Sequence, residues 1–115
     1  MKKILIIEDE KIIRDELKTL LENASYEVSF LDKFNNINND VKEKKPNLIL
    51  LDINLPNANG ELILKEIRKE SSVPVIMVTS RALEVDEVLS MSYGADDYIT
   101  KPYNPTILLL RIQNI

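Results

Sequence analysis

Apolar and polar residues follow two different periods along this chain. Short, almost continuous apolar runs occur at Ile4–Ile7, Leu48–Leu51 and Val73–Val78, as is typical of strands that are buried on both faces of a sheet. Two further strands are predicted. In Tyr26–Leu31 apolar and polar residues alternate, which indicates a half-exposed strand near an edge, and Tyr98–Ile99 is a short apolar pair.

Between these runs, apolar residues recur at the three- and four-residue spacing of amphipathic helices. The first two stripes lie at Ile13, Leu17, Leu20 and Leu21 and, more weakly, at Phe34, Ile37 and Val41. A third helix is predicted over residues 62–67, directly after the Asn59–Gly60 turn.

The last two predicted helices carry signals for their ends. The fourth is predicted from an apolar stripe at Val85, Val88 and Leu89. Gly94 can end this helix by adopting a left-handed conformation. Asn104 can cap the fifth helix, and Pro105 suits its first turn.

Strands and helices therefore alternate as five β-α units, which predicts an α/β fold. Buried strands that alternate with helices imply a five-stranded parallel sheet with helices on both faces, a flavodoxin-like three-layer sandwich. Right-handed crossovers leave few topologies, and we expect the strand order 2-1-3-4-5. With 115 residues and no internal repeat, the chain is predicted to be a single domain over residues 1–115.

The residue types that are missing narrow the possible chemistry. The chain contains no cysteine and no histidine, which excludes disulfides, thiol nucleophiles, His or Cys metal sites and a Ser-His-Asp triad. A net charge of −4 argues against nucleic-acid binding by this chain itself. The apolar runs are too short for a membrane span, and the N-terminus does not match a signal peptide. We expect a cytoplasmic protein.

Polar residues gather where the predicted strands end: Glu8 and Asp9 after the first, Asp52 after the third, Thr79 after the fourth and Lys101 after the fifth. Each has a plainer interpretation alone, as a helix cap, a solvated acid, a turn acid, a strand residue or a surface lysine. The carboxyl ends of parallel strands meet at one edge, and ligands bind where the strand order reverses. Because all five polar residues fall at strand ends on the same edge, a common functional site is favoured over five separate plain interpretations.

The chemistry of such a cluster is specific. Carboxylates held close together repel each other, so the site needs a proton or a cation. Oxygen ligands without His or Cys suit Mg²⁺, which usually shares its coordination with waters and a phosphate oxygen. An aspartate can attack phosphorus and form an aspartyl phosphate. Asp52 is the best-placed nucleophile because it ends a rigid central strand.

Four segments together resemble the receiver domain of bacterial two-component response regulators: ILIIEDE, LILLDINLPNANG, VPVIMVTSR and GADDYITKPYNP. The last two look most like the OmpR/PhoB-type regulators, whose receivers precede a winged-helix DNA-binding domain. The resemblance covers essentially the whole chain. It favours a receiver excised from a longer transcription regulator over a stand-alone receiver. It also implies that the chain takes its phosphoryl group from a sensor histidine kinase and is not a multiple-turnover enzyme.

The resemblance implies a role for each pocket residue. Asp52 would be the phospho-acceptor, and Glu8 and Asp9 would form the acid pair. Mg²⁺ would be bound by Asp9, Asp52 and the backbone carbonyl of Asn54. Lys101 would pair with the phosphoryl group.

Further residues would respond to the phosphoryl group. Thr79 would move toward it and the rotamer of Tyr98 would follow, which would alter the face of the fourth helix, fifth strand and fifth helix. The Lys101–Pro102 peptide would be cis, as in the family. Asn54 and Arg81 flank the pocket and are expected to influence hydrolysis of the phosphate.

The same face would form a homodimer on phosphorylation. One acid-arginine pair of the subfamily's dimer is retained as Asp97 and Arg111, whereas the positions of a second pair hold Glu87 and Ile107. Ile107–Leu110 is a run of apolar residues that one inward helical face cannot bury. A deeply buried helix is one interpretation. We favour an apolar interface that includes Ile107 and Leu110.

Three other functions remain for comparison. A phosphatase of the haloacid-dehalogenase type needs a second aspartate two residues after the nucleophile, where this chain has Asn54. A flavodoxin-like electron carrier needs a hydroxyl- and glycine-rich phosphate loop, where this chain has the acidic run 8–10. A degenerate receiver that only binds partners is less favoured, because every pocket position holds a competent residue.

Overall fold

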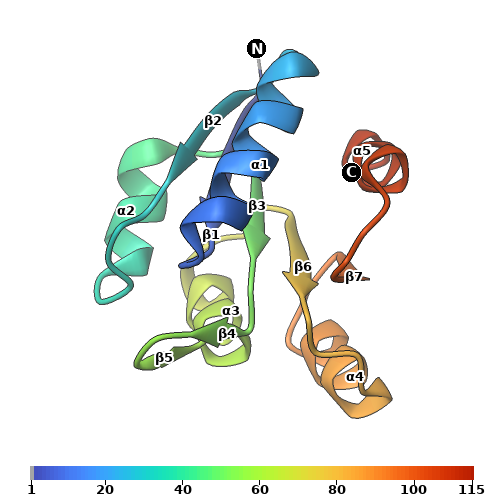
Figure 1. Cartoon of the computed structure of the whole chain (residues 1–115). Coiled ribbons are helices and arrows are strands. Elements are labelled where there is room, and N and C mark those ends of the chain that lie inside the picture. Colours follow the sequence, from blue (N-terminus) through green and yellow to red (C-terminus); the bar gives the residue numbers. More distant parts are fainter. Residues whose placement is uncertain (1) are drawn as a thin grey trace.

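A computed structural model describes residues 2–115 as a three-layer α/β domain (Figure 1). Its five-stranded parallel sheet has the order β2-β1-β3-β6-β7. The strands of this sheet are β1 (Lys3–Ile7), β2 (Glu27–Phe30), β3 (Leu48–Leu51), β6 (Val75–Thr79) and β7 (Asp97–Thr100). Counted within this sheet alone, the order is the predicted 2-1-3-4-5. The strand ends differ from the predicted ranges by at most two residues.

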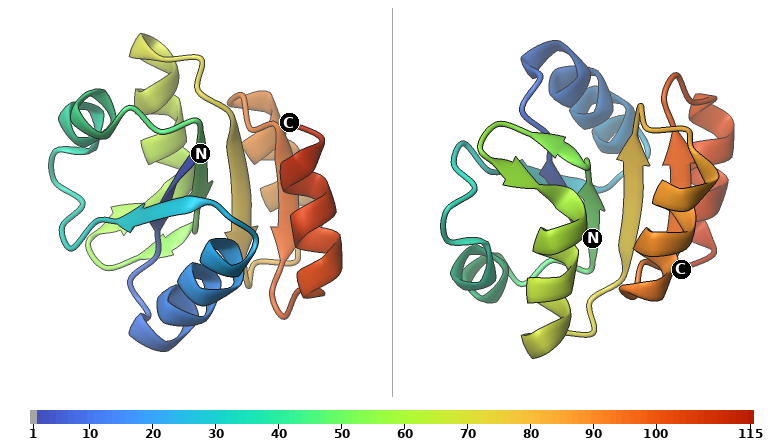
Figure 2. Two further views of the ribbon diagram at one scale, coloured as in Figure 1. Left: turned by 90° about the horizontal axis from the view of Figure 1, so that it is seen from above. Right: turned by 90° about the horizontal axis from the view of Figure 1, so that it is seen from below.

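Helices cover both faces of the sheet (Figure 2). They are α1 (Lys11–Asn23), α2 (Ile37–Lys44), α3 (Gly60–Glu70), α4 (Glu84–Ser92) and α5 (Pro105–Gln113). α1 and α5 lie on one face, and α2, α3 and α4 lie on the other. Over residues 2–115, no helix is long and apolar enough to span a bilayer.

Two separate cores lie on the two faces of the sheet. Leu5 and Ile7 belong to the core under α2 and α3, whereas Ile4 and Ile6 belong to the core under α1 and α5. Successive residues of a strand point to opposite faces. A central strand that is buried on both sides must therefore be apolar at every position, which is the pattern seen in the sequence.

The predicted helix ends are confirmed. The Asn59 side chain accepts hydrogen bonds from two amides in the first turn of α3, and Asn104 does the same for α5. Each cap satisfies amides that have no partner inside the helix. Pro105 begins α5, and Gly94 follows α4 with a φ of +106°, a conformation that favours glycine.

Helix α4 is present as predicted, but most of its apolar stripe does not face the core. Val85 and Val88 have exposed fractions of 66% and 60%, and the residues that α4 buries are Asp86 and Ser90. Hydrophobic periodicity finds a helix by its apolar stripe and assumes that this stripe faces the core. In α4 Val85 and Val88 face outward and Leu89 is half-buried, while the helix places Asp86 and Ser90 beneath it.

The loop after β3 contains a small antiparallel hairpin that was not predicted, β4 (Asn54–Leu55) with β5 (Ala58–Asn59). It leads into α3 at Gly60, where the chain passes directly over the end of β3. A Cβ atom on Gly60 would lie 2.0 Å from the carbonyl oxygen of Asp52. Glycine is therefore required at this position for the backbone to fit beside Asp52.

Candidate functional site

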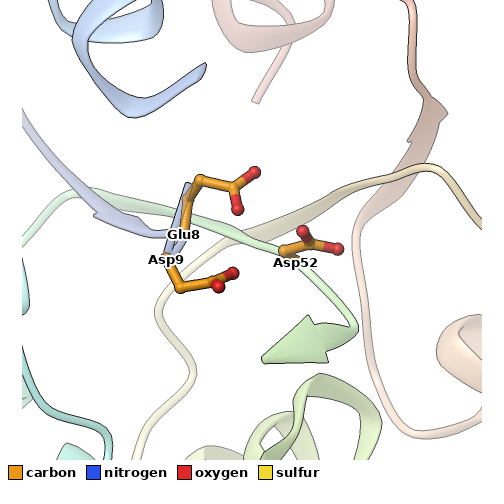
Figure 3. Close-up of side chains that lie close together, drawn as sticks. All are labelled: Glu8, Asp9 and Asp52. Atoms are coloured by element: carbon orange, nitrogen blue, oxygen red, sulfur yellow. The ribbon is translucent and has the colours of Figure 1, made fainter. Parts of the chain in front are cut away.

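Three carboxyl groups meet at the carboxyl end of the sheet (Figure 3). Glu8, Asp9 and Asp52 each offer an oxygen within 4.8 Å of the other two. The site follows from strand pairing, because Ile7 of β1 lies opposite Leu51 of β3 and the acids come directly after them. Glu8 and Asp52 are buried, with exposed fractions of 2% and 5%, whereas Asp9 is exposed.

Lys101 reaches this cluster from the end of β7. Its Nζ donates hydrogen bonds to Glu8 Oε1 and, at 3.0 Å, to Asp52 Oδ2. Burial alone would lower the pKa of Lys101, but its hydrogen bonds to Glu8 and Asp52 outweigh burial and raise the pKa. The ammonium group therefore stays charged between two buried acids. The Lys101–Pro102 peptide is cis, the isomer that the resemblance implied.

The remaining charge in the pocket is not balanced by Lys101. Burial, reinforced by the charge of Asp52, raises the pKa of Glu8 to about 7 despite the hydrogen bond from Lys101. Three carboxyls with one ammonium therefore need a further proton or a cation near neutral pH. An all-carboxylate set of oxygens in one small space suits a hard cation such as Mg²⁺.

Four more polar residues form a chain of hydrogen bonds that begins at Asp52. The amide of Asn54 donates to Asp52 Oδ1 at 3.2 Å, and Arg81 Nε donates to Asn54 Oδ1 at 2.9 Å. Thr79 ends β6 and is fully buried, and its Oγ1 accepts a hydrogen bond from the Arg81 amide at 3.3 Å. Tyr98 is also buried, and its hydroxyl donates to the carbonyl oxygen of Arg81 at 2.7 Å. Arg81 thus contacts three predicted pocket and switch residues.

Sequence reasoning missed the polar residues behind this pocket. Arg81 Nη1 forms an ion pair with Asp86 Oδ1 at 3.3 Å, and Asp86 is buried with Glu61 and Ser90. The four-residue spacing of Asp86 and Ser90 was the available signal, because it places both on one face of a helix. The apolar stripe of the same helix gave a stronger and misleading signal.

The predicted interface residues lie on α5 and β7. Ile107 and Leu110 have exposed fractions of 48% and 53%, so α5 presents apolar side chains to the surface. Asp97 and Arg111 pair within the chain, where Arg111 Nη1 contacts the two carboxylate oxygens at 2.7 and 2.8 Å. This pair is therefore satisfied inside the single chain that the structure describes.

Comparisons with known proteins agree with this geometry. The family model described as the response regulator receiver domain matches residues 4–113. The aerobic respiration control protein ArcA of Escherichia coli (strain K12) is 41% identical over 112 residues, which cover 97% of this chain and 47% of ArcA. The chain thus spans about half the length of the curated relatives it matches.

Solved structures share the whole fold. The BeF3-activated N-terminal receiver domain of Klebsiella pneumoniae RstA matches with a TM-score of 0.94 and 28% identity, covering 98% of this chain and 97% of that chain. A CheY-like response regulator receiver domain protein from Methanospirillum hungatei matches with a TM-score of 0.91 and 36% identity, covering 99% and 92%.

Proposed function

The chain belongs to the response regulator receiver domain family, most like its OmpR/PhoB-type members, and from this premise we propose that Asp52 accepts a phosphoryl group from a sensor histidine kinase. The contact between Lys101 and the buried Asp52 carboxylate, beside two further acids, is the observation that carries the proposal. An Asp52 oxygen forms the new P–O bond while the P–N bond of the donor phosphohistidine breaks, and the imidazole regains a proton.

Each pocket residue has a separate role in this transfer. The structure holds the Asp52 carboxylate in place before transfer, through the Asn54 amide on one oxygen and Lys101 on the other. Lys101 then pairs with the phosphoryl group. Asp9, Asp52 and the Asn54 carbonyl oxygen would hold Mg²⁺ beside Glu8, and the ion would neutralise charge on the phosphoryl oxygens.

Signal output follows from the position of the switch residues. Thr79 moves toward the new phosphoryl group and Tyr98 changes its rotamer, which alters the face of α4, β7 and α5. This face then forms a homodimer. The proposed output is transcriptional control in the cytoplasm through a DNA-binding domain outside residues 1–115, with slow self-dephosphorylation as the reset. Support comes from the OmpR/PhoB-type likeness and from the length of the relatives.

The test is the intact mass of the folded chain after incubation with acetyl phosphate and Mg²⁺. We expect one phosphoryl adduct, which is lost with a chelator and in Asp52→Asn. Asp32→Asn, which changes an exposed aspartate outside the pocket, should form the adduct normally. No adduct on the folded wild-type chain would reject phosphoryl acceptance and favour a receiver that acts only by binding partners.

A further inference from the structure

Helix α4 is packed with its apolar side facing solvent. Its exposed large apolar residues, together with Leu83 directly before it, have exposed fractions of 43–68%: Leu83, Val85, Val88 and Met91. The residues it buries are Asp86 and Ser90, at 8% and 0%. Among its apolar residues only Leu89 is half-buried, and Tyr93, directly after the helix, packs against the core. Burial of apolar area therefore holds the first turns of this helix only weakly, and polar contacts carry more of their packing.

The buried side of α4 rests on another acid. Glu61, in the first turn of α3, has an exposed fraction of 5%, and its Oε2 has no hydrogen-bond partner among residues 2–115. Ser90 Oγ is likewise buried without a partner in this part of the chain. Burial, and then the neighbouring charge of Asp86, raise the pKa of Glu61, although the charge of Arg81 and the nearby Ser90 hydroxyl, which lies toward Glu61 without forming a hydrogen bond of good geometry, act in the opposite direction. Two carboxyl groups thus share a poorly satisfied space beneath the helix.

Arg81 offsets this charge and also reaches the phosphorylation pocket. Within residues 2–115, it is the one cation in an ion pair with Asp86, at 3.3 Å. The same guanidinium donates from Nε to Asn54 Oδ1 at 2.9 Å, and the Asn54 amide contacts Asp52. The Arg81 backbone carbonyl accepts a hydrogen bond from the Tyr98 hydroxyl, so a shift of the backbone at Arg81 would also reach Tyr98.

We propose that Arg81, Asp86 and Glu61 form a polar latch that holds α4 in this inverted packing, and that a phosphoryl group on Asp52 opens it. The existence of the latch is argued from the contacts above, whereas its opening by phosphorylation rests on the proposed function. The phosphoryl group carries about two negative charges and replaces the single charge of the Asp52 carboxylate, whose Oδ1 accepts a hydrogen bond from the Asn54 amide, so the net gain is about one negative charge. The phosphoryl group attracts the guanidinium away from Asp86 and makes Arg81 a positioning residue for α4.

Opening the latch makes the present orientation of α4 less favourable. When Arg81 leaves, Asp86 and Glu61 remain as two buried carboxyls without that cation. The ion pair itself is only partly buried, since the Arg81 side chain is 42% exposed and that of Asp86 11%, so the cost comes mainly from the two buried acids that are left. A turn of the helix would expose Asp86 and Ser90 to water and bring Val85 or Val88 toward the domain, which relieves both defects. The latch therefore makes α4 the element that responds to charge at the pocket.

A double-mutant cycle tests the latch without phosphorylation. Amide hydrogen exchange of α4 is measured for the wild type and Arg81→Gln, each with and without the pair Glu61→Gln and Asp86→Asn. We expect Arg81→Gln to speed exchange about tenfold in the wild type, corresponding to about 1.4 kcal/mol, and by less than about twofold in the neutralised background. Equal acceleration in both backgrounds would overturn the latch. Glu84→Gln, an exposed acid in the same turn, controls for helix-dipole effects.

The second measurement follows α4 exchange and intact mass in the same samples after treatment with acetyl phosphate and Mg²⁺. We expect the adduct to speed α4 exchange in the wild type and in Glu84→Gln, but not in the neutralised variant, which should still form the adduct. An adduct with unchanged α4 exchange, or with the same change in the neutralised variant, would reject opening by phosphorylation. Failure to form the adduct would reject both the proposed function and the opening step. Whether the latch itself exists is decided separately, by the double-mutant cycle of hydrogen-exchange rates.

Discussion

Replacing Lys101 with Met should remove the cation that joins two buried carboxylates. Its Nζ contacts Glu8 and, at 3.0 Å, Asp52, and the lysine side chain itself is only 12% exposed. Loss of one partner from a buried ion pair costs about 3–5 kcal/mol. Because the pKa of Glu8 is already raised to about 7, this acid can take up a proton instead. We therefore expect the lower end, about 3 kcal/mol at neutral pH.

Urea unfolding in the presence of a chelator measures this loss of stability. For an m-value of about 1.5 kcal/mol per molar urea, a loss of about 3 kcal/mol lowers the midpoint by about 2 M. The matched control is Lys69→Met, because Lys69 pairs with Glu66 on the surface at 2.9 Å and is 63% exposed. This control should change the free energy of unfolding by less than about 0.5 kcal/mol.

Two changes of solution should reduce the deficit of Lys101→Met. A carboxyl whose pKa is raised in the folded state favours folding when it is protonated, so its unfavourable effect grows as pH rises. Lys101 lowers the pKa of Glu8 through its hydrogen bond and charge, so in Lys101→Met this pKa lies above the wild-type value of about 7. Both proteins lose stability together between 4.5 and about 7, and the deficit should shrink as pH falls toward about 7 from above. Excess Mg²⁺ should also restore stability by binding the folded state. Equal stability of Lys101→Met and Lys69→Met in chelator at neutral pH would refute the reasoning.

Three further predictions concern the packing around the site. Gly60→Ala should lower the free energy of unfolding in urea by more than about 3 kcal/mol, because its Cβ would lie 2.0 Å from the Asp52 carbonyl oxygen; near-normal stability would contradict this close approach. The raised pKa of Glu61 predicts that the wild type loses stability as pH rises above the ordinary 4.5, whereas Glu61→Gln should lose less; parallel pH profiles in a series of unfolding curves would exclude this contribution. Leu64→Ala, at a fully buried position, should cost about 2–5 kcal/mol, and Val88→Ala, at 60% exposure, less than about 0.5 kcal/mol; similar melting shifts for both would contradict the outward orientation of α4.

The architecture was predictable from local patterns in the sequence. Leu48–Leu51 is apolar at every position because both faces of β3 are covered, and this requires helices on both sides of the sheet. Asn59, Gly94 and Asn104 act through backbone atoms within a few residues, so their effects are visible in the sequence.

The pocket was predictable for a different reason. Parallel strands place their carboxyl ends at one edge, so the residues that follow β1 and β3 must lie together once the strand order is known. Glu8, Asp9 and Asp52 meet there in the structure. The contact of Lys101 with Glu8 and Asp52 depends on the same edge, although no sequence pattern states which acid the lysine pairs with.

By itself, then, the sequence determined the elements and the end of the sheet where polar residues gather, because these depend on periodicity and chain direction. Right-handed crossovers left few possible strand orders, and the structure has the expected one. Only the tertiary structure decided the orientation of α4 and the burial of Glu61, Asp86 and Ser90 beneath it. A helix with apolar residues on one side can face either way, and the partner surface selects the side that is buried. Arg81 acquires its place between Asn54 and Asp86 from residues distant in sequence, and no local pattern encodes such an ion pair.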